Sequence, residues 1–244
     1  MPSFSFYEGT RPYGATSKYG TIFSWHDAAD TSTITESGGS VSLWADKSGN
    51  GNDLAQGTAA RQPTSGAASW NSRNVLSFDG GDTIGIDNAD INTQGTIFVA
   101  FRPTTAAPGY NQWVISTDNN NTNGRVRLQY QTNPRFRSQY RNNGGNDNDV
   151  LLNAGSTSQH IWTFKADASN YTTRWDGNTV VSAASPSQLQ IDTLHLGSTD
   201  LTDNTSFQGE IGEVIVYQTA LEDWQIQETE LYLSLKWNIP LTVT

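Results

Sequence analysis

Residues 44–52 limit what this chain can fold into more than any other stretch of its sequence. They read Trp-Ala-Asp-Lys-Ser-Gly-Asn-Gly-Asn and follow an apolar run that includes Val41 and Leu43. The side chains of Asp46 and Ser48 can hydrogen-bond to their own backbone, and glycine and asparagine tolerate positive φ. The segment therefore predicts an apolar strand that breaks abruptly into a tight, hydrogen-bonded turn.

This segment resembles the W-x-D-x-S-G-N-G-N signature of laminin G-like domains, which belong to the concanavalin A-like lectin and glucanase sandwiches. Such domains are common in bacteriophage virion proteins and secreted bacterial proteins. Residues 209–217 are similar to the closing strand of the same family, Gly-x-Ile-x-Glu-Val-x-Val-Tyr. The resemblance covers residues 23–239, although only the strand pattern matches in the middle. It implies an antiparallel jelly-roll β-sandwich with one C-terminal α-helix, and it names no ligand.

The pattern of residues independently predicts an all-β protein. Short runs rich in β-branched and aromatic residues alternate with clusters of Gly, Asn, Asp, Ser and Pro, as in a β-sandwich. The predicted strands are 21–25, 75–78, 96–101, 112–116, 125–130, 135–141, 160–165, 171–175, 193–197 and 210–217.

One helix is expected at about residues 220–237. Thr219 and Glu222 have the spacing of a capping box, which places Thr219 at the N-cap. Trp224, Leu231 and Leu235 recur on one side of the helix and predict its packing face. We expect one sandwich domain at 21–244, preceded by an extended N-terminal arm at residues 1–20.

Composition excludes several classes of function. The net charge of −10 argues against nucleic-acid binding. Cysteine is absent, so disulfides and thiolate metal sites are excluded. No apolar run is long enough to cross a membrane, and the first residues lack the pattern of a secretory signal. We expect a protein made in a reducing cytoplasm, with export as the alternative.

The N-terminal arm is rich in aromatic residues, including Phe4, Phe6, Tyr7 and Tyr13, interspersed with Pro and Gly. Two interpretations remain open. The arm either lies on its own sandwich or docks its aromatic side chains into a neighbouring subunit.

Catalytic motifs are weak. A retaining glycosidase needs two carboxylates about 5 Å apart, and the best pair is Glu210 and Glu213. Three residues apart in a strand, they are expected to point to opposite faces. His26, His160 and His195 lack metal-ligand spacing, and we expect each to be buried and hydrogen-bonded. The sequence predicts no enzyme, although a lyase would need only a Tyr or His base beside an Arg.

Arginine is concentrated in one region of this acidic chain. Strand alternation predicts that the arginines of 125–130 and 135–141 share one sheet face, because a four-residue loop joins the two strands as a hairpin. The predicted ligand or partner face consists of Arg125, Arg127, Arg135, Arg137 and Arg141, with Arg174 as a sixth member. Three interpretations stay open: compensation by acids of this chain such as Asp147 and Asp149, an interface with an acidic protein, or a surface for an acidic glycan.

Two further ligand sites are candidates, with two alternatives left open: Trp113 packs in the core, and the polar turns bind no metal. Tyr110 and Trp113 lie near a predicted loop end, where aromatic faces could stack on sugars. Calcium prefers oxygen ligands. The candidate calcium ligands are Asp79, Asp82, Asp118, Asp147 and Asp149.

Together these observations favour a non-enzymatic structural or adhesion protein of a bacteriophage virion, such as a capsid decoration, fibre or tail component that binds host glycan weakly. Its expected partners are other virion proteins and copies of itself. The alternatives are a secreted carbohydrate-binding module and a polysaccharide lyase or glycoside hydrolase.

Overall fold

The computed structural model describes residues 20–117, 125–141, 147–184, 189–202 and 206–242. The N-terminal arm expected at residues 1–20 lies outside these residues except for Gly20. The described chain forms strands joined by short turns, two 3₁₀ turns and one α-helix. In chain order the elements are β1 (Ile22–Asp27), η1 (Thr31–Thr33), β2 (Ile34–Ser37), β3 (Ser40–Trp44), β4 (Leu54–Ala55), η2 (Ala59–Arg61), β5 (Thr64–Trp70), β6 (Arg73–Asp79), β7 (Ile84–Thr93), β8 (Gly95–Pro103), β9 (Gln112–Ser116), β10 (Val126–Tyr130), β11 (Arg135–Arg141), β12 (Asp147–Ala154), β13 (His160–Ala166), β14 (Asn170–Trp175), β15 (Asn178–Ala184), β16 (Leu189–Leu196), β17 (Gln208–Tyr217) and α1 (Asp223–Trp237).

The strands form two antiparallel layers, which confirms the predicted sandwich. In one layer, here the helix-side sheet, β15, β14, β13, β8 and β17 pair in that order, and β1 and β6 both pair with β17. In the other, the far sheet, the order is β12, β11, β10, β9, β16, β7, β4, β3 and β2. Strand β5 pairs with both β6 and β3, so it joins the two layers along one edge.

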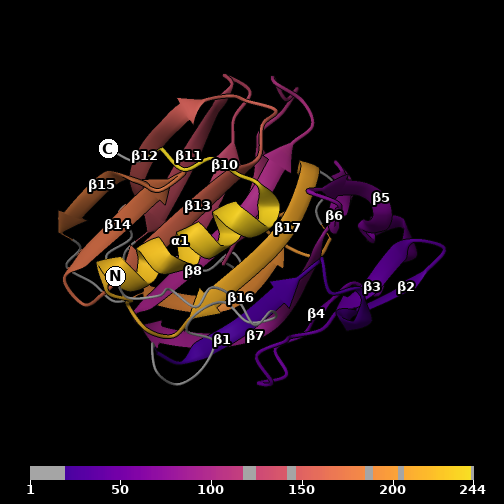
Figure 1. The fold of residues 1–244 in the computed structure, drawn as a ribbon, viewed down its shortest axis with the longest axis horizontal. Coiled ribbons are helices and arrows are strands. Elements are labelled where there is room, and N and C mark those ends of the chain that lie inside the picture. The colour runs from indigo at the N-terminus through magenta and orange to yellow at the C-terminus, as the bar shows by residue number, and fades with distance from the viewer. Residues whose placement is uncertain (1–19, 118–124, 142–146, 185–188, 203–205, 243–244) are drawn as a thin grey trace, which may run out of the picture.

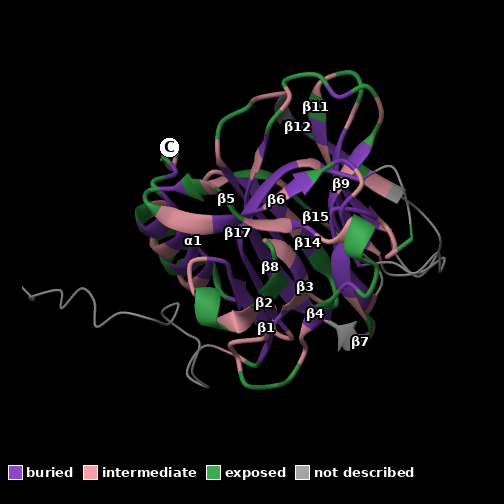
Figure 2. Ribbon diagram, turned by 90° about the vertical axis from the view of Figure 1, so that its right-hand side faces the viewer, coloured by how far each residue is buried: buried purple, intermediate pink, exposed green. Residues whose placement is uncertain are grey.

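The molecule has three layers, which are α1, the helix-side sheet and the far sheet (Figure 2). The hydrophobic core has two parts, one in each space between neighbouring layers. The larger part fills the space between the sheets and includes Phe101 and Trp162 from the helix-side sheet and Leu128 and Phe136 from the far sheet. The smaller part lies between the helix-side sheet and α1, which crosses the outer side of that sheet (Figure 1).

The helix begins later than its sequence predicts. Glu222 is the N-cap, and it forms a capping box with Gln225. Thr219 lies before the helix, where its hydroxyl accepts a hydrogen bond from the amide of Thr21. The predicted end of the helix near Trp237 is confirmed, because Asn238 adopts the left-handed conformation and terminates the element.

The prediction that Trp224, Leu231 and Leu235 form the packing face is wrong. These side chains are 50%, 42% and 56% exposed. The buried face of α1 instead mixes apolar and ionic residues: Ile226, Thr229, Glu230, Leu233, Lys236 and Trp237. Charged residues occupy buried positions because each one meets a partner on the sheet, and a hydrophobic pattern cannot reveal that partner.

The turn of residues 44–52 is a hydrogen-bonded structural element. The Asp46 carboxylate accepts hydrogen bonds from the backbone amides of Trp25, Ser48 and Asn52 and from the Ser48 hydroxyl. The Asn52 side chain donates to the carbonyl of Phe23. The motif therefore fixes β1 against the end of β3.

Candidate functional site

The outer face of the far sheet brings together several of the polar and aromatic side chains that the sequence singles out. The hairpin of β10 and β11 forms as predicted, and the register opposes Arg127 to Gln139 and Gln129 to Arg137. Alternate residues of β10 and β11, among them Leu128 and Phe136, point into the core. We call the opposite surface the β9–β12 face. Its described members are Trp113, Arg127, Gln129, Arg137, Gln139, Asp149 and Leu151.

Trp113 lies on β9, at one edge of this face. It is opposite Gln129 in the register of β9 and β10, and the Arg127 guanidinium lies 4.9 Å from the centre of its ring. Arg127 Nε also donates to the Ser116 hydroxyl at 3.2 Å. This pairing covers one side of the indole and fixes its orientation.

The next two strands supply hydrogen-bonding groups. Asp149 pairs with Arg137 at 3.0 Å and accepts from the Gln139 side chain at 2.9 Å. Within the described part of the chain, Arg137 Nε and Gln139 Oε1 are buried without hydrogen-bond partners. One of the three interpretations of the arginines was that acids of this chain neutralise their charge. This interpretation holds for Arg137, whose charge is paired with Asp149. The Arg137–Asp149 pair leaves Arg137 Nε and Gln139 Oε1 without hydrogen-bond partners among the described residues.

The remaining arginines are distributed differently. Arg125 and Arg141 lie at one end of the hairpin, where the amide of Arg141 donates to the carbonyl of Arg125, and Arg135 is exposed at the other end. The sequence placed Arg174 beside them, and this placement is wrong. Arg174 points to the opposite side of the molecule and pairs with Glu230 of α1 at 2.8 Å. It lies on a strand of the helix-side sheet, which sequence alternation alone could not assign to a layer.

Tyr110 lies at the rim of the sandwich, away from the cation-bound ring of Trp113. Its hydroxyl donates to the backbone carbonyls of Gly80 and Ser206. The two aromatic residues predicted as one stacking site therefore have different surroundings, and Trp113 is the one on the sheet face.

The carboxylates proposed as calcium ligands fall in separate places. Asp82 accepts from the amide of Asp79 at 2.9 Å, and burial raises the pKa of Asp82 to about 6, helped by the nearby Asp79 carboxylate. Asp149 is engaged on the β9–β12 face, whereas Asp118 and the side chain of Asp147 lie outside the described residues. Among the described residues no three His, Cys, Asp or Glu side chains converge as a metal site.

The side chains of Glu210 and Glu213 do not point to opposite faces of the sheet, as the sequence predicted. The register shifts between Ile211 and Glu213, and this β-bulge places both glutamates on the outer side of the helix-side sheet. Both are buried, and each meets a cation. Glu210 pairs with Arg102 at 2.7 Å, and Glu213 pairs with Lys236 at 2.7 Å. The predicted opposite orientation is therefore wrong. Glu213 contacts α1, whereas Glu210 accepts a hydrogen bond from the indole nitrogen of Trp70.

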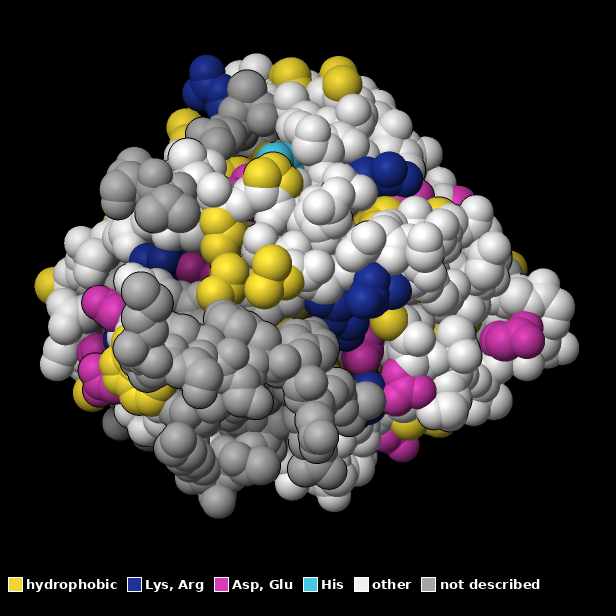
Figure 3. Space-filling view, viewed as in Figure 1, with side chains coloured by type: hydrophobic (Ala, Val, Ile, Leu, Met, Phe, Trp, Pro, Cys, Tyr) yellow, Lys and Arg dark blue, Asp and Glu magenta, His cyan; other side chains and the backbone are white. Residues whose placement is uncertain are grey.

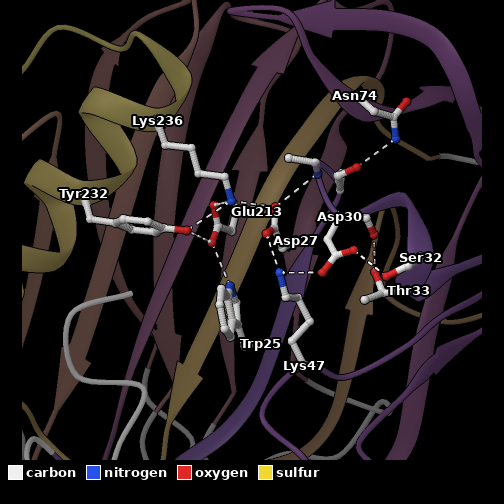
Figure 4. Close-up of polar contacts among 12 residues, drawn as sticks. Trp25, Asp27, Asp30, Ser32, Thr33, Lys47, Asn74, Glu213, Tyr232 and Lys236 are labelled. Atoms are coloured by element: carbon white, nitrogen blue, oxygen red, sulfur yellow. Dashed lines mark hydrogen bonds and ion pairs between the residues drawn. The ribbon is translucent and has the colours of Figure 1, made fainter. Parts of the chain in front are cut away.

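Glu213 belongs to a buried polar network that the sequence did not reveal (Figure 4). Its carboxylate accepts hydrogen bonds from the indole nitrogens of Trp25 and Trp237 and from the Tyr232 hydroxyl. Burial raises its pKa, and Lys236 opposes that rise.

The ionic half of this network continues into β1. Lys236 also pairs with Asp27 at 2.6 Å, and Asp27 pairs with Lys47, which reaches Asp30. These contacts tie α1 to β17 and β1. The network is therefore part of the structural interior, even though it concentrates ionisable groups.

The three histidines are also interior residues. His160 contacts Asp176 at 2.8 Å, and His195 contacts Asp87 at 3.0 Å, which confirms that both are buried and hydrogen-bonded. His26 is fully buried, but neither ring nitrogen has a hydrogen-bond partner in the described structure. Burial lowers its pKa to about 4, so the ring is neutral near neutral pH. The three side chains lie on β1, β13 and β16 and form no common centre.

No helix among the described residues is long and apolar enough to cross a membrane. No family model matches the sequence, and no curated protein matches it either.

Solved structures, in contrast, share the fold. One is domain 4 of an extracellular arabinanase from Geobacillus stearothermophilus in complex with arabinotriose, with a TM-score of 0.61, 13% identity, and coverage of 87% of this chain and 100% of that one. Another is the binding domain of Paraclostridial Mosquitocidal Protein 1, with a TM-score of 0.63, 14% identity, and coverage of 89% and 53%. A third is the ligand-binding domain of botulinum neurotoxin serotype D in complex with N-acetylneuraminic acid, with a TM-score of 0.61, 11% identity, and coverage of 91% and 54%.

At these identities the likeness shows the fold alone. The chain spans about half the length of the two toxin structures. Fold and topology define the class: an antiparallel β-sandwich carrying one C-terminal helix. The particular activity has to be argued from the β9–β12 face.

Proposed function

We propose that this protein is a non-catalytic glycan-binding domain and that the β9–β12 face is its binding surface. The observation that carries this proposal is Trp113, a partly exposed indole on the outer face of the far sheet, with the Arg127 guanidinium against its ring. A fixed aromatic ring binds the apolar C–H face of a sugar at little cost in side-chain entropy.

The neighbouring groups suit the rest of a sugar. Gln129, Arg137 and Gln139 lie on the adjacent strands β10 and β11 and carry the donors and acceptors that sugar hydroxyls require. Arg137 is partly exposed, whereas the two glutamines are buried. The guanidinium of Arg137 can also pair with a carboxylate or sulfate, although it shares its charge with Asp149. Two structures of the same fold have arabinotriose or N-acetylneuraminic acid bound, which supports the use of this architecture for saccharides.

A non-catalytic role is supported by the position of the acids. Glu210 and Glu213 are buried and each is paired with a cation, Glu213 beneath α1 and Glu210 with Arg102 of β8. A lyase or hydrolase is the competing proposal, and release of unsaturated or reducing ends from a polysaccharide would support it.

The expected setting is a bacteriophage particle, in which the domain acts as a decoration, fibre or tail component beside other virion proteins and copies of itself. The family resemblance of residues 44–52 and 209–217 supports this part of the proposal. Many copies would turn weak sites into strong attachment. A secreted carbohydrate-binding module would instead act as a single copy.

A glycan array tests the proposal. The wild-type protein should bind a defined set of glycans, and Trp113→Ala should reduce that signal by about tenfold or more, which corresponds to about 1.4 kcal/mol. Trp224→Ala is the matched control, because it removes an exposed indole from α1 on the other side of the molecule. Equal loss in both variants, or no binding by the wild type, would contradict the proposal.

A further inference from the structure

The outward side of α1 carries an exposed apolar stripe. Trp224, Leu231 and Leu235 are seven and four residues apart, so they lie on one side of the helix. Figure 3 shows a group of hydrophobic side chains on the surface over α1, seen from the same direction as Figure 1. Large apolar side chains gathered on the surface usually mark an interaction site.

The N-terminal part of the chain meets the rest of the protein beside this helix. Gly20 packs so closely on Thr219 that a Cβ atom there would lie 2.9 Å from that side chain. The amide of Thr21 donates to the Thr219 hydroxyl, and the amide of Gln218 donates to the carbonyl of Thr21. These contacts fix the point from which residues 1–19 extend, four residues before α1 begins at Asp223.

The composition of residues 1–19 complements the stripe. The segment supplies aromatic side chains at Phe4, Phe6, Tyr7, Tyr13 and Tyr19, and it carries two cations against one acid. The exposed surface at the start of α1 is acidic, with Glu222, Asp223 and Glu228. An apolar, weakly basic segment therefore begins next to an apolar, acidic helix face.

The reach is sufficient within one molecule. Nineteen extended residues span up to about 60 Å, whereas a helix of fifteen residues is about 22 Å long. A tethered segment also has an effective concentration in the millimolar range, which favours its own helix over that of another copy.

We propose that residues 1–19 bind in cis along the outward side of α1 and cover Trp224, Leu231 and Leu235. The helix then has two partners: the sheet beneath it and the N-terminal segment above it. The interaction fixes the end of the chain on the side opposite the β9–β12 face, and it is independent of glycan binding.

Disulfide trapping tests this directly, because the chain contains no cysteine. The full-length double variant Tyr13→Cys/Leu231→Cys is oxidised with diamide, and the products are separated without reductant. Tyr13→Cys/Leu151→Cys is the matched control, since Leu151 is 52% exposed on the far sheet. We expect an intramolecular disulfide to form about tenfold faster in the test pair than in the control pair. A disulfide-linked dimer would assign the helix to a second copy and overturn the cis proposal, and equal rates would overturn docking altogether.

Proteolysis of the full-length protein gives a second test without new thiols. Chymotrypsin cleaves after the aromatic residues of 1–19, and a docked segment resists it. Leu231→Glu/Leu235→Glu should speed that cleavage about tenfold, whereas Leu151→Glu should leave it unchanged. Since both leucines on α1 are exposed, these variants are expected to fold. Unchanged cleavage in the α1 variant would contradict the proposal.

Discussion

At the scale of single residues, Asp46 shows how one carboxylate can join two parts of a sandwich. It accepts four hydrogen bonds, three from backbone amides and one from the Ser48 hydroxyl. One of these amides belongs to Trp25, in a strand far away in sequence. Without the carboxylate, partly buried amides would lose their partners, and such losses are costly.

Replacing Asp46 with alanine should therefore lower the free energy of unfolding by about 2–4 kcal/mol. Glu228→Gln, which changes an exposed carboxylate on α1, should cost less than about 0.5 kcal/mol. Urea unfolding of both variants measures the difference. Equal stability of the two would show that the motif does not support the fold.

Gly212 is a second residue whose identity has a geometric cause. A Cβ atom there would lie 3.0 Å from Trp70 and 3.1 Å from Trp237. Those two rings meet edge to face under the helix. The glycine sits within the register shift of β17, where a larger residue would push the rings apart.

Gly212→Ala should destabilise the protein by about 1–3 kcal/mol through overpacking. Gly57→Ala provides the control, because a Cβ atom there meets nothing within 4 Å. Thermal unfolding of both variants should show a lower midpoint only for Gly212→Ala. A similar midpoint for both would contradict the packing described here.

Asp82 and His26 predict a measurable dependence of stability on pH. The folded-state pKa of Asp82 is raised from 3.8 to about 6, so its contribution to stability is full below pH 4 and is lost as pH rises to about 6. The pKa of His26 is lowered from 6.5 to about 4, so its contribution is full above pH 6.5 and is lost as pH falls to about 4. The two effects oppose each other over the same pH range.

Asp82→Asn should remove the contribution of Asp82 to the pH dependence of stability. Relative to wild type, the variant should gain up to about 3 kcal/mol of unfolding free energy between pH 4 and pH 6.5, which corresponds to about two pKa units. The asparagine oxygen can still accept from the amide of Asp79. Urea titrations at several pH values measure the difference, and parallel pH profiles for the two proteins would exclude the raised pKa.

At the scale of elements, α1 is attached to its sheet by buried ion pairs as much as by apolar contact. Arg174 and Glu230 pair beneath the helix, and Thr163 donates to the same carboxylate. A second pair, Lys165 and Asp223, also joins sheet and helix but at 3.8 Å, with Asp223 83% exposed. The two pairs differ mainly in burial.

Glu230→Gln should cost about 3–5 kcal/mol, because it leaves the Arg174 guanidinium buried without a counter-charge. Asp223→Asn should cost less than about 1 kcal/mol, since exposed pairs contribute little. Denaturant unfolding of the two variants separates the cases. A cost of the same size for both would show that burial does not govern the attachment of α1.

Local sequence patterns predicted the elements that have one apolar face and missed those that do not. The hairpin of β10 and β11 and the inward residues Leu128 and Phe136 followed from alternation, because one face of these strands is apolar. The exposed strands β2, β5 and β15 were not predicted, since they lack that pattern. The buried face of α1 was also predicted wrongly. Its buried charged residues, such as Glu230, are stabilised by partners that are distant in sequence, and a hydrophobic pattern does not reveal them.

The candidate site was predictable only in part. Sequence alternation placed Arg127 and Arg137 on one face, and a predicted loop end singled out Trp113 together with Tyr110. It could not tell that Arg174 lies in the other layer, because the pairing of β14 depends on the whole topology. Nor could it tell that the bulge before Glu213 reverses the direction of that side chain.

At the scale of the whole molecule, the three layers give the protein two different surfaces. The far sheet presents an indole, guanidiniums and amides, whereas α1 presents an apolar and acidic side. Because the folded sandwich separates them, one surface can bind a ligand while the other is attached to the chain's own N-terminal segment. This division suits a domain displayed in many copies, in which each site is weak.

The most direct test of glycan binding is an NMR titration that follows the indole N–H signals of the eight tryptophans. A glycan that binds the protein on the array is added stepwise, with signals assigned by single substitutions. We predict that the Trp113 signal shifts progressively and saturates, while those of Trp224 and the buried Trp25 stay in place. Saturable shifts at Trp224 with none at Trp113, or no shift at any indole, would contradict the assignment of the β9–β12 face as the binding surface.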